Sequence, residues 1–191
     1  MASAWHVAQR QFPELAVSTP RLHIRRLEPE DAKEVTEIFA DKLTRRWLPY
    51  PSADGPIDGG PWCDEIAEER RSSGIGDHYG VILRDDDSLI GCVWAKRTDW
   101  AAGSTEIVYV MAADSRGEGY ATEAVLGLTM ALVRRHGFHR VELRTVPGNA
   151  ASRRVAEKAG FHYEGRLRDS GYVHSGRVDL ELWSLVAADL G

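Results

Sequence analysis

The clearest pattern of apolar and polar positions lies in the middle of the chain, where it predicts a strand followed by a helix. Residues 104–111 alternate with a period of two, which is typical of a strand with two different faces. Apolar residues then recur at helical spacing from Thr122 to His136, and Gly137 is a typical helix end. One face of the strand carries Glu106, Val108 and Val110, and the other carries Ile107, Tyr109 and Met111.

Further strands and helices are predicted on both sides of this unit. The same patterns predict strands at 21–27, 79–84, 88–95, 139–145, 161–165 and 178–185, and helices at 30–41, 62–71 and 150–158. The polar turn at 85–87 suggests a hairpin, which together with 104–111 makes a three-stranded antiparallel meander. The strand at 139–145 follows a helix and is therefore expected to run parallel to 104–111.

Two stretches lack a regular pattern. Residues 43–60 hold several prolines and glycines beside Trp47, so we expect an irregular segment that either lines a binding site or packs its aromatic residues on the core. Residues 1–20 show weak periodicity and predict a loosely attached N-terminal arm, which could pair with a second subunit in a homodimer. The expected organisation is this arm, one domain at 21–187 and a short tail at 188–191.

Composition narrows the class of protein. The chain has 191 residues, of which 43% are hydrophobic and 28% charged, as expected for one soluble domain. Its net charge of −5 argues against a nonspecific nucleic-acid-binding protein, because phosphate neutralisation needs a basic surface. No apolar run is long enough to span a membrane, and residues 1–10 lack the pattern of a secretory signal. We therefore expect a cytoplasmic protein with no membrane or nucleic-acid partner.

The turn between the central strand and helix has the features of an anion site. Gly117 and Gly119 allow the backbone to approach a phosphate closely, and the positive end of the helix dipole favours negative charge. A dinucleotide-binding turn needs a third glycine where Thr122 stands, and a nucleotide-triphosphate loop ends in Gly-Lys-Ser/Thr. Neither pattern is present, so the turn suits a different phosphate-bearing ligand.

Two motifs resemble those of one family. The turn Arg116-Gly-Glu-Gly-Tyr-Ala121 is similar to the Arg/Gln-x-x-Gly-x-Gly/Ala loop of the GNAT superfamily of acyl-CoA-dependent N-acyltransferases. The stretch from Asn149 to Phe161 resembles the signature Asn-x-x-Ser-x-x-Val-Ala-x-Lys-x-Gly-Phe, most like the branch of ribosomal-protein N-terminal acetyltransferases. The resemblance covers about Thr19 to Leu185. It implies an α/β fold with a mixed, mostly antiparallel twisted sheet and helices on both faces.

The resemblance also implies a co-substrate and its binding residues. Acetyl-CoA is expected to donate an acetyl group to a primary amine, either a protein N-terminus or a small molecule. In this family the central strand splays from its neighbour and leaves backbone groups free for the pantetheine arm, while the glycine turn holds the pyrophosphate. The implied coenzyme-binding residues are Val108, Tyr109, Val110, Met111, Arg116, Gly117, Glu118, Gly119, Tyr120, Ala121, Asn149 and Ser152.

Such a reaction needs a base for the amine, a donor to the oxyanion and an acid for the leaving thiolate. Glu106 is the favoured base because it lies on the central strand, and Asp169 is a second candidate. Many relatives place a tyrosine acid where this chain has Ala156, so Ser152 is the best substitute, with Tyr172 a weaker one. No metal is required, and the histidines show no zinc-ligand spacing.

Other interpretations stay open. The protein could transfer a longer acyl group, modify an antibiotic, or bind the coenzyme only as a sensor. Asn149 also fits a helix N-cap, a role that is compatible with touching a ligand. The acidic residues between 64 and 69 either attract a cationic acceptor or form a solvated helix face.

Overall fold

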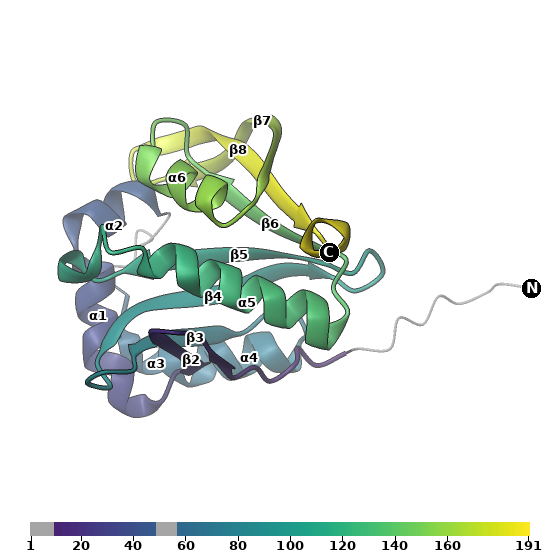
Figure 1. Ribbon diagram of the computed structural model, residues 1–191. Coiled ribbons are helices and arrows are strands. Elements are labelled where there is room, and N and C mark those ends of the chain that lie inside the picture. The colour runs from purple at the N-terminus through teal and green to yellow at the C-terminus, as the bar shows by residue number, and fades with distance from the viewer. Residues whose placement is uncertain (1–9, 49–56) are drawn as a thin grey trace, which may run out of the picture.

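The computed structural model describes residues 10–48 and 57–191, which form one twisted sheet flanked by helices (Figure 1). The strands are β1 (Val17–Ser18), β2 (Leu22–Arg26), β3 (His78–Leu83), β4 (Leu89–Asp99), β5 (Ser104–Met111), β6 (Arg140–Thr145), β7 (His162–Val173) and β8 (Gly176–Val186). The helices are α1 (Ala32–Ala40), α2 (Lys42–Trp47), α3 (Gly59–Cys63), α4 (Glu65–Ser72), α5 (Tyr120–His136) and α6 (Ala150–Lys158). Among the described residues the strand order is β1-β2-β3-β4-β5-β6-β8-β7.

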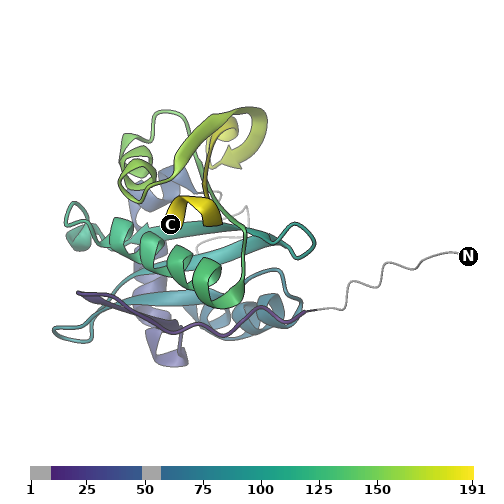
Figure 2. The same ribbon diagram turned by 45° about the vertical axis from the view of Figure 1, so that its right-hand side comes forward.

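Helices cover both faces of the sheet, as the two views in Figure 1 and Figure 2 show. Helix α5 crosses one face, where Val125, Leu128 and Leu132 are buried in the larger core. On the other face, α1 and α3 contribute Phe39 and Trp62 to a second apolar cluster. Each helix buries its apolar side against one sheet face, so β5, which lies between β4 and β6, is covered on both faces.

The alternation predicted for β5 is confirmed. Val108 and Val110 pack in the cluster on the α1 side, whereas Ile107, Tyr109 and Met111 pack on the α5 side. Glu106 shares the face of the two valines and is buried. One strand therefore presents a carboxylate to one side of the sheet and a phenol to the other.

The central pair of strands separates after a short contact. β5 and β6 are parallel and pair only from Ser104 to Glu106, opposite residues 140–142. Beyond Glu106, β5 continues to pair with β4 on its other edge, up to Met111. The backbone groups on the β6-facing edge of residues 107–111 consequently have no strand partner, and an edge of this kind can hydrogen-bond an extended ligand.

Most predicted elements are confirmed. The meander β3-β4-β5 is antiparallel, and helix α6 has the predicted bounds. β7 extends well beyond the predicted 161–165, pairs with β8 and shifts register twice, which accommodates polar residues that broke the sequence pattern. The irregular segment predicted at 43–60 contains most of α2 and the start of α3, and its residues 49–56 lie outside the described ones.

The expected loose attachment of the N-terminal arm is wrong for the part that the structure describes. Phe12 and Leu15 are almost fully buried, and Val17 pairs with Ile24 of β2. Phe12 contacts the rings of Trp100 and Phe138, with centroids 6.1 Å and 5.9 Å away. These apolar residues are spaced irregularly because the segment follows the contours of the core in an extended conformation, which leaves no periodic signal in the sequence.

Candidate active site

A cleft of about 580 Å³ opens where β5 and β6 diverge. Its walls come from α2, the end of β4, the free edge of β5, the turn before α5, the start of α6 and part of β7. Residues that were predicted separately, including Glu106, Tyr109, Gly119 and Ser152, all line this one cleft. The sheet therefore brings the predicted coenzyme turn and two of the predicted catalytic residues together.

One end of the cleft is the turn at the start of α5. Gly117 and Gly119 have φ values of +90° and +84°, a left-handed conformation that favours glycine. Gly119 is the N-cap of α5, and no side chain caps this helix. The first N–H groups of a helix lack intrahelical partners and sit at its positive end, so this turn can bind an anion.

The side chain of Arg116 contacts α2 and the end of β5. Its guanidinium donates to Asp41 Oδ2 at 2.7 Å, to Thr44 Oγ1 at 3.1 Å and to the Met111 carbonyl at 3.1 Å. Burial alone would raise the pKa of Asp41, but the hydrogen bonds from Arg116 and from the first amides of α2 outweigh it and lower that pKa. Arg116 thus anchors α2 to the turn, and we expect the turn to hold a phosphate through its backbone.

Arg21 holds the same turn from the opposite side. Its Nε donates to Glu123 Oε2 at 2.7 Å, and its Nη1 donates to the Glu118 carbonyl at 3.0 Å. The guanidinium also lies 4.5 Å from the ring centroid of Tyr120. Burial opposes the ionised form of Glu123, but hydrogen bonds from Thr19 and Arg21 lower its pKa overall. The turn is therefore fixed in place before any ligand binds.

The middle of the cleft contains a pair of hydroxyl groups. Tyr109 Oη on β5 lies 3.0 Å from Ser152 Oγ on α6. Burial raises the pKa of Tyr109 to about 12, and its hydrogen bond with Ser152 opposes this only in part. Asn149 caps α6 by accepting from the Ser152 N–H at 3.1 Å, which confirms the predicted N-cap. The phenol stays protonated at neutral pH and can supply a proton across the gap.

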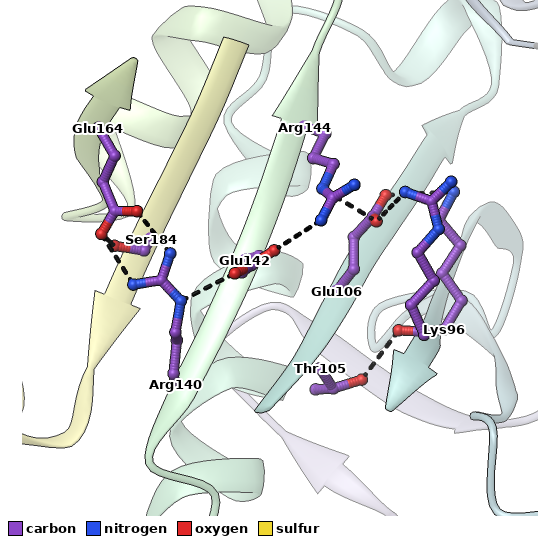
Figure 3. Close-up of polar contacts among 9 residues, drawn as sticks. Lys96, Thr105, Glu106, Arg140, Glu142, Arg144, Glu164 and Ser184 are labelled. Carbon is purple, nitrogen blue, oxygen red and sulfur yellow. Dashed lines mark hydrogen bonds and ion pairs between the residues drawn. The ribbon is translucent and has the colours of Figure 1, made fainter. Parts of the chain in front are cut away.

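On the other sheet face, Glu106 is surrounded by cations. Its side chain is only 4% exposed and contacts Lys96 Nζ at 3.1 Å, Arg97 Nη1 at 3.0 Å and Arg144 Nε at 3.4 Å. Figure 3 shows this carboxylate between Arg144 of β6 and Lys96 of β4. Each oxygen faces at least one cationic donor, so few of the lone pairs of Glu106 remain free for a further donor.

This contact continues as a row of alternating charges across the sheet (Figure 3). Arg144 also contacts Glu142 at 3.1 Å, and Arg140 joins Glu142 to Glu164. Glu106 and Glu142 are direct neighbours in the parallel register, an arrangement in which two carboxylates repel. Arg144 contacts both of them and so compensates this repulsion at the point where the strands begin to separate.

Two predicted functional groups, Asp169 and the acidic residues of α4, lie outside the cleft wall. Asp169 is exposed, pairs with Arg177 Nε at 2.7 Å and is absent from the cleft wall. The acidic residues of α4 are also outside it, and Glu68 is engaged with Arg26 and Arg71.

Tyr172 does line the cleft, but its side chain is largely exposed. Within residues 10–48 and 57–191, no three His, Cys, Asp or Glu side chains gather as a metal site would require.

Three features of the site were not predicted from the sequence. The hydroxyl of Tyr109 was not recognised as a partner of Ser152, because the register between β5 and α6 is set by packing. Helix α2 was hidden in a proline-rich stretch, although Asp41 is a good N-cap signal. The cations around Glu106 come from β4 and β6, and alternation alone does not bring Arg97 to this face. Only the cap of α2 could have been found from the sequence.

Comparison with known proteins identifies the family. A family model described as an acetyltransferase (GNAT) domain matches residues 21–162. YdaF of Bacillus subtilis, provisionally named as a ribosomal N-acetyltransferase, is 31% identical over 167 residues, which cover 85% of this chain and 90% of YdaF.

Solved structures show the same fold. RimJ of Mycobacterium smegmatis, crystallised with a CoA disulfide, superposes with a TM-score of 0.82 at 23% identity, covering 95% of this chain and 91% of RimJ. The ribosomal-protein-S5-alanine acetyltransferase of Vibrio fischeri superposes with a TM-score of 0.79 at 18% identity, covering 93% of this chain and all of that one. None of the described helices of the present chain has the length and apolar character needed to cross a bilayer. Its two motifs, its splayed strands and the family match over residues 21–162 together show that the chain belongs to the GNAT family of N-acetyltransferases.

Proposed function

We propose that this protein transfers the acetyl group of acetyl-CoA to the α-amine of a peptide or protein by direct attack on the thioester. The single observation that carries the proposal is the splay between β5 and β6, which has the glycine turn at one end and Glu106 at the other. The pyrophosphate binds the backbone from Gly117 to Ala121. The pantetheine arm pairs with the free edge of Val108 to Met111, and Asn149 and Ser152 lie beside it.

The two sheet faces take different parts of the reaction. The amine enters on the face of Glu106, which accepts its proton as a contact with Lys96 or Arg97 lengthens. A backbone N–H on the free edge of β5 donates to the oxyanion. Ser152 donates to the departing sulfur and is replenished by Tyr109, whose hydroxyl lies 3.0 Å from it. The attacking and leaving groups are thus served from opposite sides of one strand.

The contacts of Glu106 favour an α-amine over a lysine side chain as acceptor. A carboxylate whose oxygens are already held by cations is poorly placed to deprotonate a strongly basic amine. An α-amine has a pKa of about 7.7–8.0, against about 10.4 for lysine, so a far larger fraction is neutral at physiological pH. The family relatives named for ribosomal proteins agree with a protein N-terminus as the acceptor class.

A thiol-release assay tests the proposal. Acetyl-CoA binding is first measured by calorimetry, and release of free CoA is then followed with a short peptide that carries one α-amine. The matched control is the same peptide with its N-terminus acetylated and one lysine added. We expect binding, and release with the first peptide accompanied by N-terminal acetylation in mass spectrometry. Release with the lysine peptide alone would overturn the α-amine assignment, and the absence of coenzyme binding would overturn the placement of the site.

A further inference from the structure

We propose that the Lys96–Arg97 end of the charge row is a subsite for a carboxylate on the acceptor, next to the amine that is acetylated. This inference rests on the proposed function, because it names which α-amine substrates the cleft prefers. The ligand class is a peptide N-terminus with an acidic side chain at its second residue.

The charge row is unbalanced at this end. The row contains four cations, Lys96, Arg97, Arg144 and Arg140, and three carboxylates, Glu106, Glu142 and Glu164, which leaves one positive charge over. The excess lies at the Lys96 end, where two cations share one carboxylate, while the opposite end closes on Glu164. Lys96, Arg97 and Arg144 line the cleft, and Glu106 is the one carboxylate among its described wall residues.

A distortion of β4 creates this excess. Lys96 pairs with Glu106 in the antiparallel register, and the register then shifts between Lys96 and Asp99. Arg97 adopts a φ of +54°, a left-handed conformation that is unfavourable for a non-glycine residue. In a regular strand, consecutive side chains point to opposite faces. The bulge instead brings Arg97 to the face of Lys96, so that two consecutive residues contact the same carboxylate.

Arg97 is only partly used by its neighbours. Its side chain is 52% exposed, whereas that of Glu106 is 4% exposed. To the residues that the structure describes, its guanidinium makes one hydrogen bond, from Nη1 to Glu106 Oε2 at 3.0 Å. A guanidinium carries five N–H donors in a planar fork that suits a carboxylate. The remaining donors lie beside the group that receives the amine proton, in a cleft that concentrates positive charge.

The geometry predicts which acceptors bind well. With its α-amine at Glu106, a peptide directs its first side chains along the same wall, where an aspartate at residue two can pair with Arg97. A lysine at residue two meets Arg97 and Lys96 and is repelled. A polycation such as a polyamine is disfavoured for the same reason, which favours the alternative that the acidic residues between 64 and 69 form a solvated helix face.

Binding of reaction products tests the subsite without requiring turnover. CoA-saturated protein is titrated with three N-acetylated tetrapeptides that differ only at residue two, which is Asp, Asn or Lys. We expect the Asp peptide to bind about tenfold more tightly than the Asn peptide, with Lys weakest, and the difference to shrink at high salt. Arg97→Gln should abolish the Asp preference, and Arg97→Lys, which keeps the charge, should retain part of it.

The control variant is Arg177→Gln. Arg177 is likewise exposed and paired with a single carboxylate, Asp169, but it lies outside the cleft wall, so its loss should leave the Asp preference unchanged. Equal binding of the three peptides to the wild type, or an Asp preference that survives Arg97→Gln, would overturn the subsite. The outcome for the proposed function is separate, because that proposal is tested by coenzyme binding and by CoA release with an α-amine peptide. A preference for Asp among products can be measured whether or not CoA is released.

Discussion

At the scale of single residues, a change at Glu106 should impair acetyl transfer without impairing coenzyme binding. Glu106 lies on the sheet face opposite the Tyr109–Ser152 pair and contacts no part of the glycine turn. Glu106→Gln keeps the shape of the side chain but removes the proton acceptor, so kcat/KM for a peptide amine should fall about 10²–10⁴-fold. The affinity for acetyl-CoA, measured by calorimetry, should stay within about twofold of the wild type. Unchanged turnover would show that another group accepts the proton.

The hydroxyl pair predicts a second residue-scale result. If Tyr109 acts through Ser152, then Tyr109→Phe and Ser152→Ala should each lower kcat, and the double variant should be little worse than the worse single one. Because the pKa of Tyr109 is about 12, this donor stays protonated and should cause no loss of kcat up to about pH 10. Fully additive losses in single-turnover measurements would argue that the two hydroxyls act independently.

At the scale of elements, helix α5 carries a matched pair of glycines. Gly119 and Gly137 flank the helix with φ values of +84° and +73°, so alanine at either position should cost a similar amount of stability, about 1 kcal/mol. Only Gly119 belongs to the cleft wall. We expect Gly119→Ala to weaken acetyl-CoA binding at least about tenfold, because an added Cβ and a strained turn obstruct the close approach of the pyrophosphate. Equal affinities of the two variants for acetyl-CoA would show that this turn does not hold the pyrophosphate.

Elements with strong local signals could be predicted from the sequence, and those fixed by distant contacts could not. Helix α6 begins at a capping asparagine and ends before a glycine, so residues at its two ends determine its bounds. The alternation of β5 likewise reports its two covered faces. In contrast, β7 continues past Asp169, which has a φ of +51°, because β8 pairs with β7 on both sides of that irregularity. No local sequence pattern predicts a strand of that kind.

The active site was predictable to the extent that its residues belong to short motifs. The glycine turn and the stretch from Asn149 to Phe161 carry the resemblance, and both reach the cleft. The contacts of the Arg116 side chain with α2 could not be predicted, because they join residues far apart in the sequence. The cations around Glu106 meet only when β4, β5 and β6 assemble, and the bulge at Arg97 leaves no trace in the hydrophobic pattern.

At the scale of the whole molecule, a buried carboxylate lowers stability as pH rises from about 4 to about 6. Asp77 is fully buried; burial raises its pKa to about 6, although the His78 N–H and Arg26 act in the opposite direction. Between its unfolded pKa near 3.9 and this folded value, the native state holds a proton that the unfolded chain releases. The contribution of Asp77 to stability is therefore lost as pH rises through that window.

The adjacent His78 makes stability depend on pH in the opposite direction. Burial lowers its pKa to about 3, so below about pH 6.5 the unfolded chain gains a proton that the native state does not, and stability falls as pH decreases. The two slopes oppose each other between about pH 4 and 6. Asp77→Asn should remove the contribution of Asp77. In denaturant titrations, the stability of this variant relative to the wild type should rise by about 2–3 kcal/mol from pH 4 to pH 7. A difference that is constant with pH would contradict this account.

The arrangement of the whole molecule around the splay is the central claim, and backbone hydrogen exchange tests it most directly. Exchange is compared with and without acetyl-CoA, and each amide is assigned to its residue. The account predicts protection at two separate places, the free edge of β5 from Val108 to Met111 and the turn from Gly117 to Ala121, with β3 unchanged. Coenzyme binding that protects neither place, or that protects the turn without β5, would contradict a thioester held between the diverging strands.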